Sequence, residues 1–400
     1  MKRILFVDDE PRILDGLRDM LRRERKRWDM VFALGGEAAL AECERQPFDV
    51  LVSDMRMPQM DGAQLLTRVR ERYPGTVRII LSGHTEPEAA MRAVPVAHQF
   101  LAKPCDATTL TRTIERACAM QGRVQNDAMR RLLGLIDGLP PRPRVYSDML
   151  ALLQDGGGST AQLARVLERD LALGAKLLQL VNSAFFGAPR HITRIEDAVA
   201  YVGQRTILDL AVSVSAFSSP TPVAGLSLDA LQRRSFVAGR VAQSLVQDET
   251  LRDEAFLAGM LQDIGMLTLA ARLPAHWAAA LGSIAAVPRP LHAVEHELWG
   301  VTHADVGAYL LGLWGLPDRV VEAVARHHDP RAAAAEHADL VAATYLAGRL
   351  ARECDTEAVH PDVVALEALD VAYLADTGLA DRVDETRARV RELAAGGQGG

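Results

Sequence analysis

Five polar residues near the start of the chain could do phosphoryl chemistry together if the fold brings them to one place. They are three carboxylates, a hydroxyl and an ammonium: Asp8, Asp9, Asp54, Ser82 and Lys103. Carboxylate oxygens suit Mg²⁺, which prefers octahedral oxygen coordination, and clustered carboxylates need such a cation because they repel one another. With the cation present, a carboxylate can attack a phosphoryl group and become an acyl phosphate. Lys103 could then pair with one phosphoryl oxygen while Ser82 donates a hydrogen bond to another.

Each of these residues ends or directly follows a short apolar run. The runs cover residues 4–7, 50–53, 77–81 and 99–102. Helices are expected between them, over residues 11–25, 36–44, 62–72, 86–94 and 106–120, with one more strand over 30–34. Continuous aliphatic runs that alternate with helices predict a doubly wound, five-stranded parallel α/β sheet. Because ligands bind beyond the carboxyl ends of such strands, we expect the five polar residues to meet at one edge of the sheet.

The spacing of these residues resembles that of the receiver domains of response regulators, over about residues 1–122. The resemblance rests on the motifs Val7-Asp8-Asp9-Glu10, Ser53-Asp54-Met55-Arg56-Met57-Pro58, Leu81-Ser82-Gly83 and Lys103-Pro104. It implies that Asp54 is the phosphoacceptor. It also implies that Asp9, Asp54 and the backbone carbonyl of Arg56 bind Mg²⁺ directly, with Asp8 acting through water.

The same resemblance implies how a switch would work. Ser82 would be the hydroxyl that responds to phosphorylation, and Lys103 would assist at the phosphoryl group. Phe100 matches the aromatic whose rotation reports phosphorylation, although the sequence is equally compatible with a packed aromatic that does not move. The Lys103–Pro104 bond would be cis. The implied partners are a sensor histidine kinase and a downstream signalling protein of a bacterial two-component system.

Length and composition limit the other function classes. A chain of 400 residues exceeds a single compact core, so about two or three domains are expected. The net charge of −7 argues against an extended nucleic-acid surface, and no apolar run approaches the ~20 residues that a membrane span requires. The 4 cysteines lack zinc-type spacing, which favours free thiols in a reducing compartment. We therefore expect a cytoplasmic protein that binds neither DNA nor a membrane.

After about residue 106 the pattern becomes helical. The expected organisation is a receiver domain (1–122), a helical connector (123–138), an all-helical output domain (139–395) and a disordered glycine-rich tail (396–400). The boundary is marked by Gly138-Leu139-Pro140-Pro141-Arg142-Pro143, a segment that cannot propagate a helix.

The second half resembles the HDOD domain, an all-helical relative of the HD metal-dependent phosphohydrolases. The matching segments include Asn182-Ser183-Ala184-Phe185-Phe186-Gly187, Ala258-Gly259-Met260-Leu261-Gln262-Asp263-Ile264-Gly265, His303-Ala304-Asp305-Val306-Gly307, Trp314-Gly315-Leu316-Pro317 and His327-His328. The signature at 182–187 fits a packed helix end or a surface groove for a protein partner, and the sequence leaves both open.

An active HD site holds divalent metal with a histidine on one helix, a His-Asp pair on the next and a later aspartate. Here Arg234 stands where the first histidine would fall, and Gln262 replaces the histidine of the pair next to Asp263. Met266 occupies a position where active HD sequences commonly have lysine. A guanidinium cannot bind metal, and an amide is a poor substitute for imidazole. No metal cofactor is therefore expected in the helical domain, and a metal-bound hydrolytic water is unsupported.

Three other histidines, His303, His327 and His328, invite a metal hypothesis, but structural roles are favoured. Residues 302–305 have the pattern of a capping box that would begin a helix at His303. His327 and His328 would end a helix, where histidine interacts favourably with the helix dipole. His292 and His296 lie four residues apart on a possible helix face, but no other residue supports a ligand pair.

Two main hypotheses follow for the function. The favoured one is a two-component response regulator, phosphorylated on Asp54, that switches a non-catalytic helical module for protein interaction. The alternative is a receiver-controlled, metal-dependent phosphohydrolase acting on a nucleotide or cyclic dinucleotide. A third interpretation makes the helical domain chiefly a homodimerisation element. The sequence leaves the sign of the phosphorylation effect open.

Overall fold

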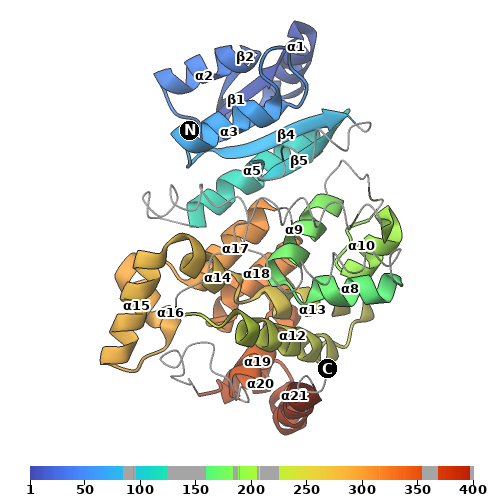
Figure 1. Ribbon diagram of the computed structural model, residues 1–400, viewed down its shortest axis with the longest axis vertical. Coiled ribbons are helices and arrows are strands. Elements are labelled where there is room, and N and C mark those ends of the chain that lie inside the picture. Colours follow the sequence, from blue (N-terminus) through green and yellow to red (C-terminus); the bar gives the residue numbers. More distant parts are fainter. Residues whose placement is uncertain are drawn as a thin grey trace.

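The computed structural model places five parallel strands in one sheet, in the order β2-β1-β3-β4-β5 (Figure 1). The strands are β1 Lys2–Asp8, β2 Trp28–Leu34, β3 Val50–Asp54, β4 Val77–Gly83 and β5 Gln99–Lys103. Every residue of β3 is buried, which explains why its sequence is continuously apolar up to Ser53. The strand order reverses direction between β1 and β3, and ligands of such sheets bind at this point. The predicted α/β fold class is confirmed.

Helices connect these strands and cover the sheet. They are α1 Pro11–Met20, the 3₁₀ turn η1 Arg22–Lys26, α2 Gly36–Arg45, α3 Gly62–Arg72 and α5 Ala107–Arg123. Asp61 caps α3, because its carboxylate accepts a hydrogen bond from the Gln64 backbone while the Gln64 side chain accepts one from Asp61. The helix predicted over residues 11–25 is shorter than expected. Four of the five residues of η1 are basic, and like charges at helical spacing disfavour a longer α-helix.

All elements described after α5 are helical, as predicted. They are α8 Thr160–Glu168, α9 Leu171–Val181, α10 Ile195–Val202, α12 Leu228–Leu245, α13 Arg252–Leu261, α14 Ile264–Arg272, α15 Pro274–Ala286, α16 Leu291–Trp299, α17 His303–Leu313, α18 Asp318–Arg326, α19 Ala338–Glu353, α20 Val371–Asp376 and α21 Val383–Gly396. Helices α12 and α13 touch backbone to backbone. A Cβ on Gly259 would lie 2.7 Å from the Ala238 carbonyl oxygen, so glycine is required at this crossing.

The structure describes residues 1–83, 93, 96–123, 159–182, 188, 190–204, 207, 225–314, 316–353 and 368–396. Most of the helix expected over 86–94, most of the connector at 123–138 and the Pro-rich boundary at 138–143 lie outside these ranges. Of the 182–187 signature, only Asn182 is described; its side chain bonds the backbone N–H and carbonyl of Ile192 and so ties the end of α9 to the segment before α10. Helix α21 includes Gly396, so it extends one residue into the segment predicted as a disordered tail.

The edge of the sheet that carries β4 and β5 faces the helical half, while β2 lies at the far edge (Figure 1). Helix α5 contacts α17 between the two halves. The last two strands that the structure describes, β4 and β5, therefore form the edge of the sheet that lies against the helical half.

Among the described residues, no single helix is both long and apolar enough to cross a membrane. One sharply bent pair, Glu249–Arg272 with Pro274–Ala286, reaches that length and composition together.

Candidate functional site

Asp8, Asp54 and Lys103 lie together at the carboxyl edge of the sheet. The Nζ atom of Lys103 lies 2.6 Å from Asp8 Oδ2 and also pairs with Asp54 Oδ1. Asp8 and Asp54 are 2% and 7% exposed, so one ammonium balances two buried carboxylates. Because β4 separates β5 from β3, Lys103 reaches Asp54 across the intervening strand. The sheet order therefore creates a contact between residues 49 positions apart, Asp54 and Lys103.

The loops after β1 and β3 fix the two carboxylates. The Arg56 backbone N–H donates to Asp54 Oδ2 at 2.6 Å, and the Glu10 backbone N–H donates to Asp8 Oδ1 at 2.9 Å. Gly62 brings the start of α3 back over the end of β3, where a Cβ would lie 2.3 Å from the Asp54 carbonyl oxygen. A side chain at position 62 would therefore displace the loop that holds Asp54.

The pocket raises the pKa values of both Asp54 and Lys103. Burial raises the pKa of Asp54, and the negative charge of Asp8 adds to this effect, whereas the Lys103 ammonium opposes it. Burial alone would lower the pKa of Lys103, but hydrogen bonds and charges from Asp54 and Asp8 raise it. Lys103 is therefore held in its charged form, and Asp54 depends on Lys103 to remain ionised.

The other predicted pocket residues occupy the surrounding positions. Asp9 follows Asp8 and is half-buried, and Arg56 is exposed. Ser82 lies near the end of β4 with its backbone paired to Ala102; its side chain is outside what the structure describes. Phe100 is buried, and the Lys103–Pro104 peptide bond is cis, as the resemblance implied.

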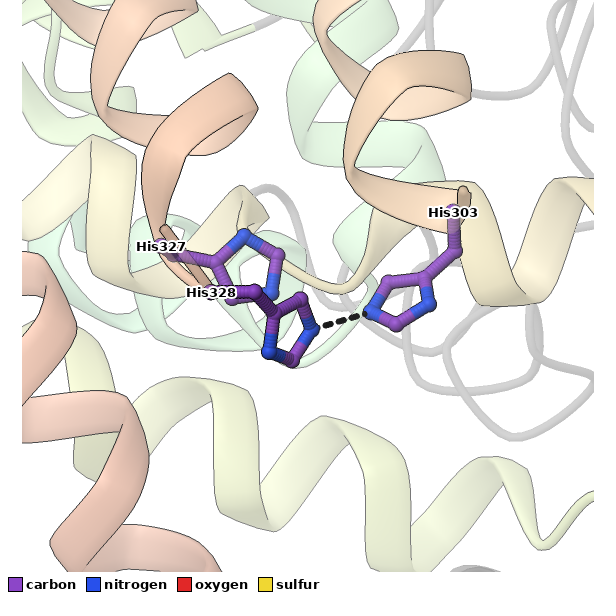
Figure 2. A group of neighbouring side chains, drawn as sticks. All are labelled: His303, His327 and His328. Atoms are coloured by element: carbon purple, nitrogen blue, oxygen red, sulfur yellow. Dashed lines mark hydrogen bonds between the residues drawn. The ribbon is translucent and has the colours of Figure 1, made fainter. Parts of the chain in front are cut away.

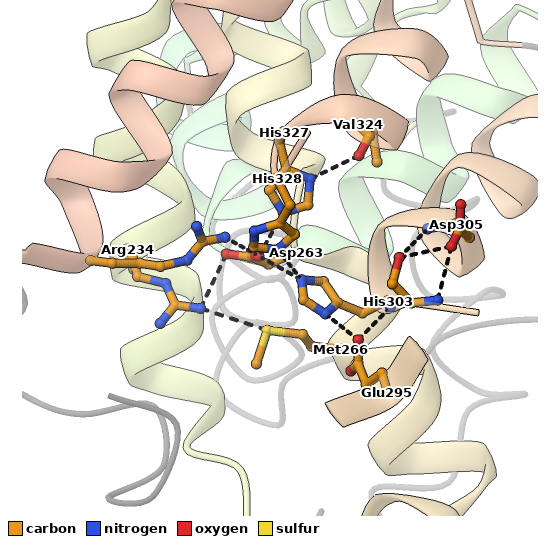
Figure 3. Close-up of polar contacts among 11 residues, drawn as sticks. Arg234, Asp263, Met266, Glu295, His303, Asp305, Val324, His327 and His328 are labelled. Carbon is orange, nitrogen blue, oxygen red and sulfur yellow. Dashed lines mark hydrogen bonds and ion pairs between the residues drawn. The ribbon is translucent and has the colours of Figure 1, made fainter. Parts of the chain in front are cut away.

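A second polar cluster lies inside the helical half, around Asp263 (Figure 3). The Asp263 carboxylate is fully buried and accepts hydrogen bonds from Arg234 at 3.1 Å and Arg352 at 2.9 Å. Burial would raise the pKa of Asp263, but the two guanidinium groups hold it well below its usual range. Arg234 thus fills the expected histidine position with a positive charge directed at the remaining aspartate.

Gln262 contributes no polar contact to this cluster among the described residues. Its side chain is fully buried, and neither amide atom has a hydrogen-bond partner in the described structure. It packs against Gly348, where a Cβ would lie 2.3 Å from Gln262 Oε1. Arg234 also approaches the Met266 sulfur at 3.8 Å. The departures from the HD pattern at 234, 262 and 266 are therefore accommodated by packing and by ion pairs.

His303, His327 and His328 lie side by side (Figure 2), and the first two lie next to Asp263 (Figure 3). His303 begins α17 behind the predicted capping box of Thr302 and Asp305, and His327 caps the end of α18. The Nε2 atoms of His303 and His328 are 2.9 Å apart. The predicted positions at the two helix ends are confirmed, and the fold additionally brings these two ends together.

Burial governs the protonation of His327 and His328. It lowers the pKa of each ring well below the usual value, and nearby positive charges, including Arg352, act in the same direction. His292 stacks on His328 with ring centres 4.0 Å apart, while His296 on the same helix is exposed. The spacing of His292 and His296 therefore places only the first of them against the cluster.

Polar contacts also join the α/β half to the helical half. The Gln179 side-chain amide of α9 donates to the His98 carbonyl at 2.6 Å, and Gln99 of β5 donates to the Gly312 carbonyl at 3.4 Å. Arg116 of α5 pairs with Asp318 at 2.6 Å and also donates to the Leu316 carbonyl. The strand that ends at Lys103 therefore begins at this interface.

Two known families account for most of the chain. The response regulator receiver domain matches residues 4–115, and the HDOD domain matches residues 139–330. The first match contains the Asp54 pocket, and the second contains the cluster around Asp263. The chain belongs to the response regulators with an HDOD domain. In this receiver–HDOD protein the two polar clusters thus lie in separate domains.

Solved and curated proteins are similar to large parts of this chain. The response regulator MmoQ from Methylococcus capsulatus is 25% identical, with a TM-score of 0.50; the match covers 64% of this chain and 99% of MmoQ. A virulence factor of Campylobacter jejuni shares the fold at 20% identity and a TM-score of 0.50, over 66% of this chain and 97% of that one. The hydrogenase transcriptional regulatory protein HoxA of Cupriavidus necator is 36% identical over 153 residues, which are 38% of this chain and 31% of HoxA. The receiver–HDOD chain therefore spans about a third of HoxA.

Sequence reasoning missed several residues of the cluster around Asp263 and of the domain interface. Arg352 pairs with Asp263 from 89 residues away, and Glu295 contacts His303 from α16. Nothing in the sequence pattern indicated that Arg116 and Gln179 would lie at the domain interface. Each lies on an ordinary helix with a polar side chain, and only the packing of that helix assigns it a role.

Proposed function

We propose that this protein is a response regulator that is phosphorylated on Asp54 in a Mg²⁺-dependent reaction and uses its HDOD domain as a non-catalytic module for protein interaction. The observation that carries the proposal is the pair of buried carboxylates, Asp8 and Asp54, held by Lys103 at the switch point of the sheet. A sensor histidine kinase would be the phosphodonor, and a downstream signalling protein would receive the output.

The pocket supports nucleophilic attack by Asp54. One Asp54 oxygen would attack the phosphorus of the donor, and the bond from phosphorus to the leaving group, a P–N bond in a phosphohistidine, would break. The Lys103 ammonium would bind an oxygen of the new phosphoryl group, because it already contacts the attacking carboxylate. Asp8, Asp9, Asp54 and the Arg56 carbonyl are the oxygen donors that would hold Mg²⁺, and bound Mg²⁺ would neutralise the carboxylates and the phosphoryl charge.

Strand β5 supports a route from the pocket to the output domain. Lys103 ends this strand in the pocket, while Gln99 begins it against the Gly312 carbonyl of α17. A phosphoryl group on Asp54 would draw Lys103 away from Asp8, so the change would act on the strand that also forms the domain interface. We infer that phosphorylation alters how the receiver domain docks on α17 and α18.

A non-catalytic role for the HDOD domain is supported by the cluster around Asp263. The carboxylate that an HD hydrolase would offer to metal is engaged by two arginines, and Gln262 supplies no imidazole. The basic side chain Arg234 is fixed where a ligand would be needed. These replacements argue against the hydrolase hypothesis and leave protein binding as the output.

Phosphorylation can be tested on the full-length protein with acetyl phosphate and Mg²⁺. Intact-mass measurement should show the addition of one phosphoryl group to wild type and to the control Asp19→Asn, which changes an exposed aspartate of α1. Asp54→Asn should show none, and chelation of Mg²⁺ should abolish the addition. Equal phosphate uptake by wild type and Asp54→Asn would refute the assignment of Asp54.

A further inference from the structure

We propose that His303, His327 and His328, which lie beside Asp263, form a binding site for one divalent transition-metal ion such as Zn²⁺. One ring nitrogen of each histidine lies within 4.8 Å of those of the other two. The Asp263 Oδ1 atom is 3.7 Å from the Nε2 atoms of both His303 and His327 (Figure 3). This site goes beyond the proposed signalling function and departs from the sequence-based expectation that the helical domain holds no metal.

In two of the histidines, the ring nitrogen that points away from the proposed ion, Nδ1, is hydrogen-bonded as it usually is in metal-binding histidines. His303 Nδ1 lies 2.7 Å from Glu295 Oε2, which also accepts the His303 backbone N–H, and His327 Nδ1 lies 2.8 Å from the Val324 carbonyl oxygen. Both oxygens act as acceptors here, so the Nδ1 atoms of the two rings carry the protons. Each Nε2 atom is left with a lone pair that faces the shared centre. Histidines that bind metal usually donate their other ring N–H to a carboxylate or a backbone carbonyl in this way.

One of the three facing nitrogens lacks a hydrogen-bond partner among the described residues, and the other two bond only to each other there. His327 Nε2 is buried and has no hydrogen-bond partner among the described residues. His328 Nε2 and His303 Nε2 lie 2.9 Å apart, so the two rings share one hydrogen between these atoms. A metal ion would take the place of that shared hydrogen while the His328 proton shifts to its Nδ1 atom. Three imidazole lone pairs would then converge on one ion (Figure 2).

The surrounding charges select the class of metal. Arg234 and Arg352 already neutralise the Asp263 carboxylate, so the site lacks the excess negative charge that Mg²⁺ or Ca²⁺ requires. Neutral imidazole nitrogens instead favour borderline ions such as Zn²⁺ or Co²⁺. Because Arg234 and Gln262 remove two of the ligands of an HD centre, a single ion is expected.

The ion would connect the far ends of two consecutive helices, α17 and α18. His303 begins α17, and His327 and His328 follow the last residue of α18. The turn between these two helices lies at their opposite ends and provides Leu316 and Asp318 to the receiver domain. Metal binding would therefore brace the helical hairpin on which the receiver domain docks.

The test uses untagged full-length protein, stripped with a chelator and titrated with Co²⁺, whose visible absorption reports the coordination geometry. We expect saturation at one equivalent with a tetrahedral-type spectrum, displacement by Zn²⁺ and no displacement by Mg²⁺. His303→Gln and His328→Gln should abolish the band, and Glu295→Gln should weaken Co²⁺ binding by roughly 10- to 100-fold because it releases the His303 ring. His296→Gln, an exposed histidine of α16, is the matched control and should bind as wild type does.

Circular dichroism and thermal unfolding without metal would show that each variant is folded. Absence of the band in folded wild-type protein would overturn the proposal, as would a band of equal strength in folded His303→Gln and His328→Gln. Equal competition by Mg²⁺ would refute the argument from charge. Phosphate uptake at Asp54 is measured separately and does not depend on either result.

Discussion

Replacement of Gly265 by alanine is expected to destabilise the HDOD domain strongly. Gly265 lies in α14 where this helix meets the start of α17. A Cβ there would lie 1.9 Å from the His303 carbonyl oxygen and 2.9 Å from the Gly307 backbone nitrogen. Both contacts are with backbone, so no side-chain rotation can relieve them. Helices α14 and α17 would have to move apart by about 1.5 Å to restore an ordinary contact.

The magnitude follows from two opposing effects. Alanine is favoured over glycine in a helix by about 1 kcal/mol, whereas overpacking costs typically about 1–3 kcal/mol and occasionally more. Because the clash with backbone is severe, the cost should lie at the upper end, and the net loss should be about 2 kcal/mol. For a domain of this size, a loss of about 2 kcal/mol lowers the midpoint of thermal unfolding by about 4–8 °C.

Gly282→Ala provides the matched control. Gly282 lies in α15, and a Cβ there would have no neighbouring heavy atom within 4 Å. This variant should gain roughly 0.5–1 kcal/mol from helix propensity alone. Scanning calorimetry of both full-length variants would measure the helical-domain transition. Equal or higher stability of Gly265→Ala relative to Gly282→Ala would refute the reasoning about the α14–α17 contact.

The same variant links packing to the metal proposal. His303 lies at the start of α17, so separating α14 from α17 would shift His303 relative to the other two histidines. Gly265→Ala should therefore weaken Co²⁺ binding while phosphate uptake at Asp54 stays unchanged. Wild-type Co²⁺ affinity in a destabilised Gly265→Ala would contradict this link.

Three further outcomes are expected. Asp263→Asn should cost about 3–5 kcal/mol in denaturant unfolding, because it leaves two arginines without their counter-charge; a loss below about 1 kcal/mol would contradict the ion-pair assignment. Arg116→Ala should speed amide hydrogen exchange around Asp318, and unchanged exchange would argue against docking through α5. Burial and the positive charges of Arg78 and Lys176 lower the pKa of His98, so the folded state resists protonation of this ring. The free energy of unfolding should therefore fall as the pH drops below about 6.5, by up to about 1.4 kcal/mol per pH unit for this group. His98→Gln should make the free energy of unfolding depend less steeply on pH.

The sequence alone determined the receiver domain and its pocket. Continuous apolar runs with helices between them specify a parallel sheet, and in such a sheet the carboxyl ends of the strands must share one edge. Asp8, Asp54 and Lys103 are therefore brought together by a rule that does not depend on the details of packing. The helical character of the second half and the capping box before His303 were predictable for the same reason, since both are local patterns.

Only the tertiary structure decided how the polar residues of the helical half are arranged. The pairing of Arg352 with Asp263, the support of His303 by Glu295 and the meeting of His303 with His327 and His328 depend on how α14, α16, α17, α18 and α19 cross. Helix crossings are set by side-chain packing over long sequence distances, which no local spacing encodes. The contact of Arg116 with α18 has the same origin. A parallel sheet fixes where its strand ends lie, whereas a helical bundle fixes such positions only once it is packed.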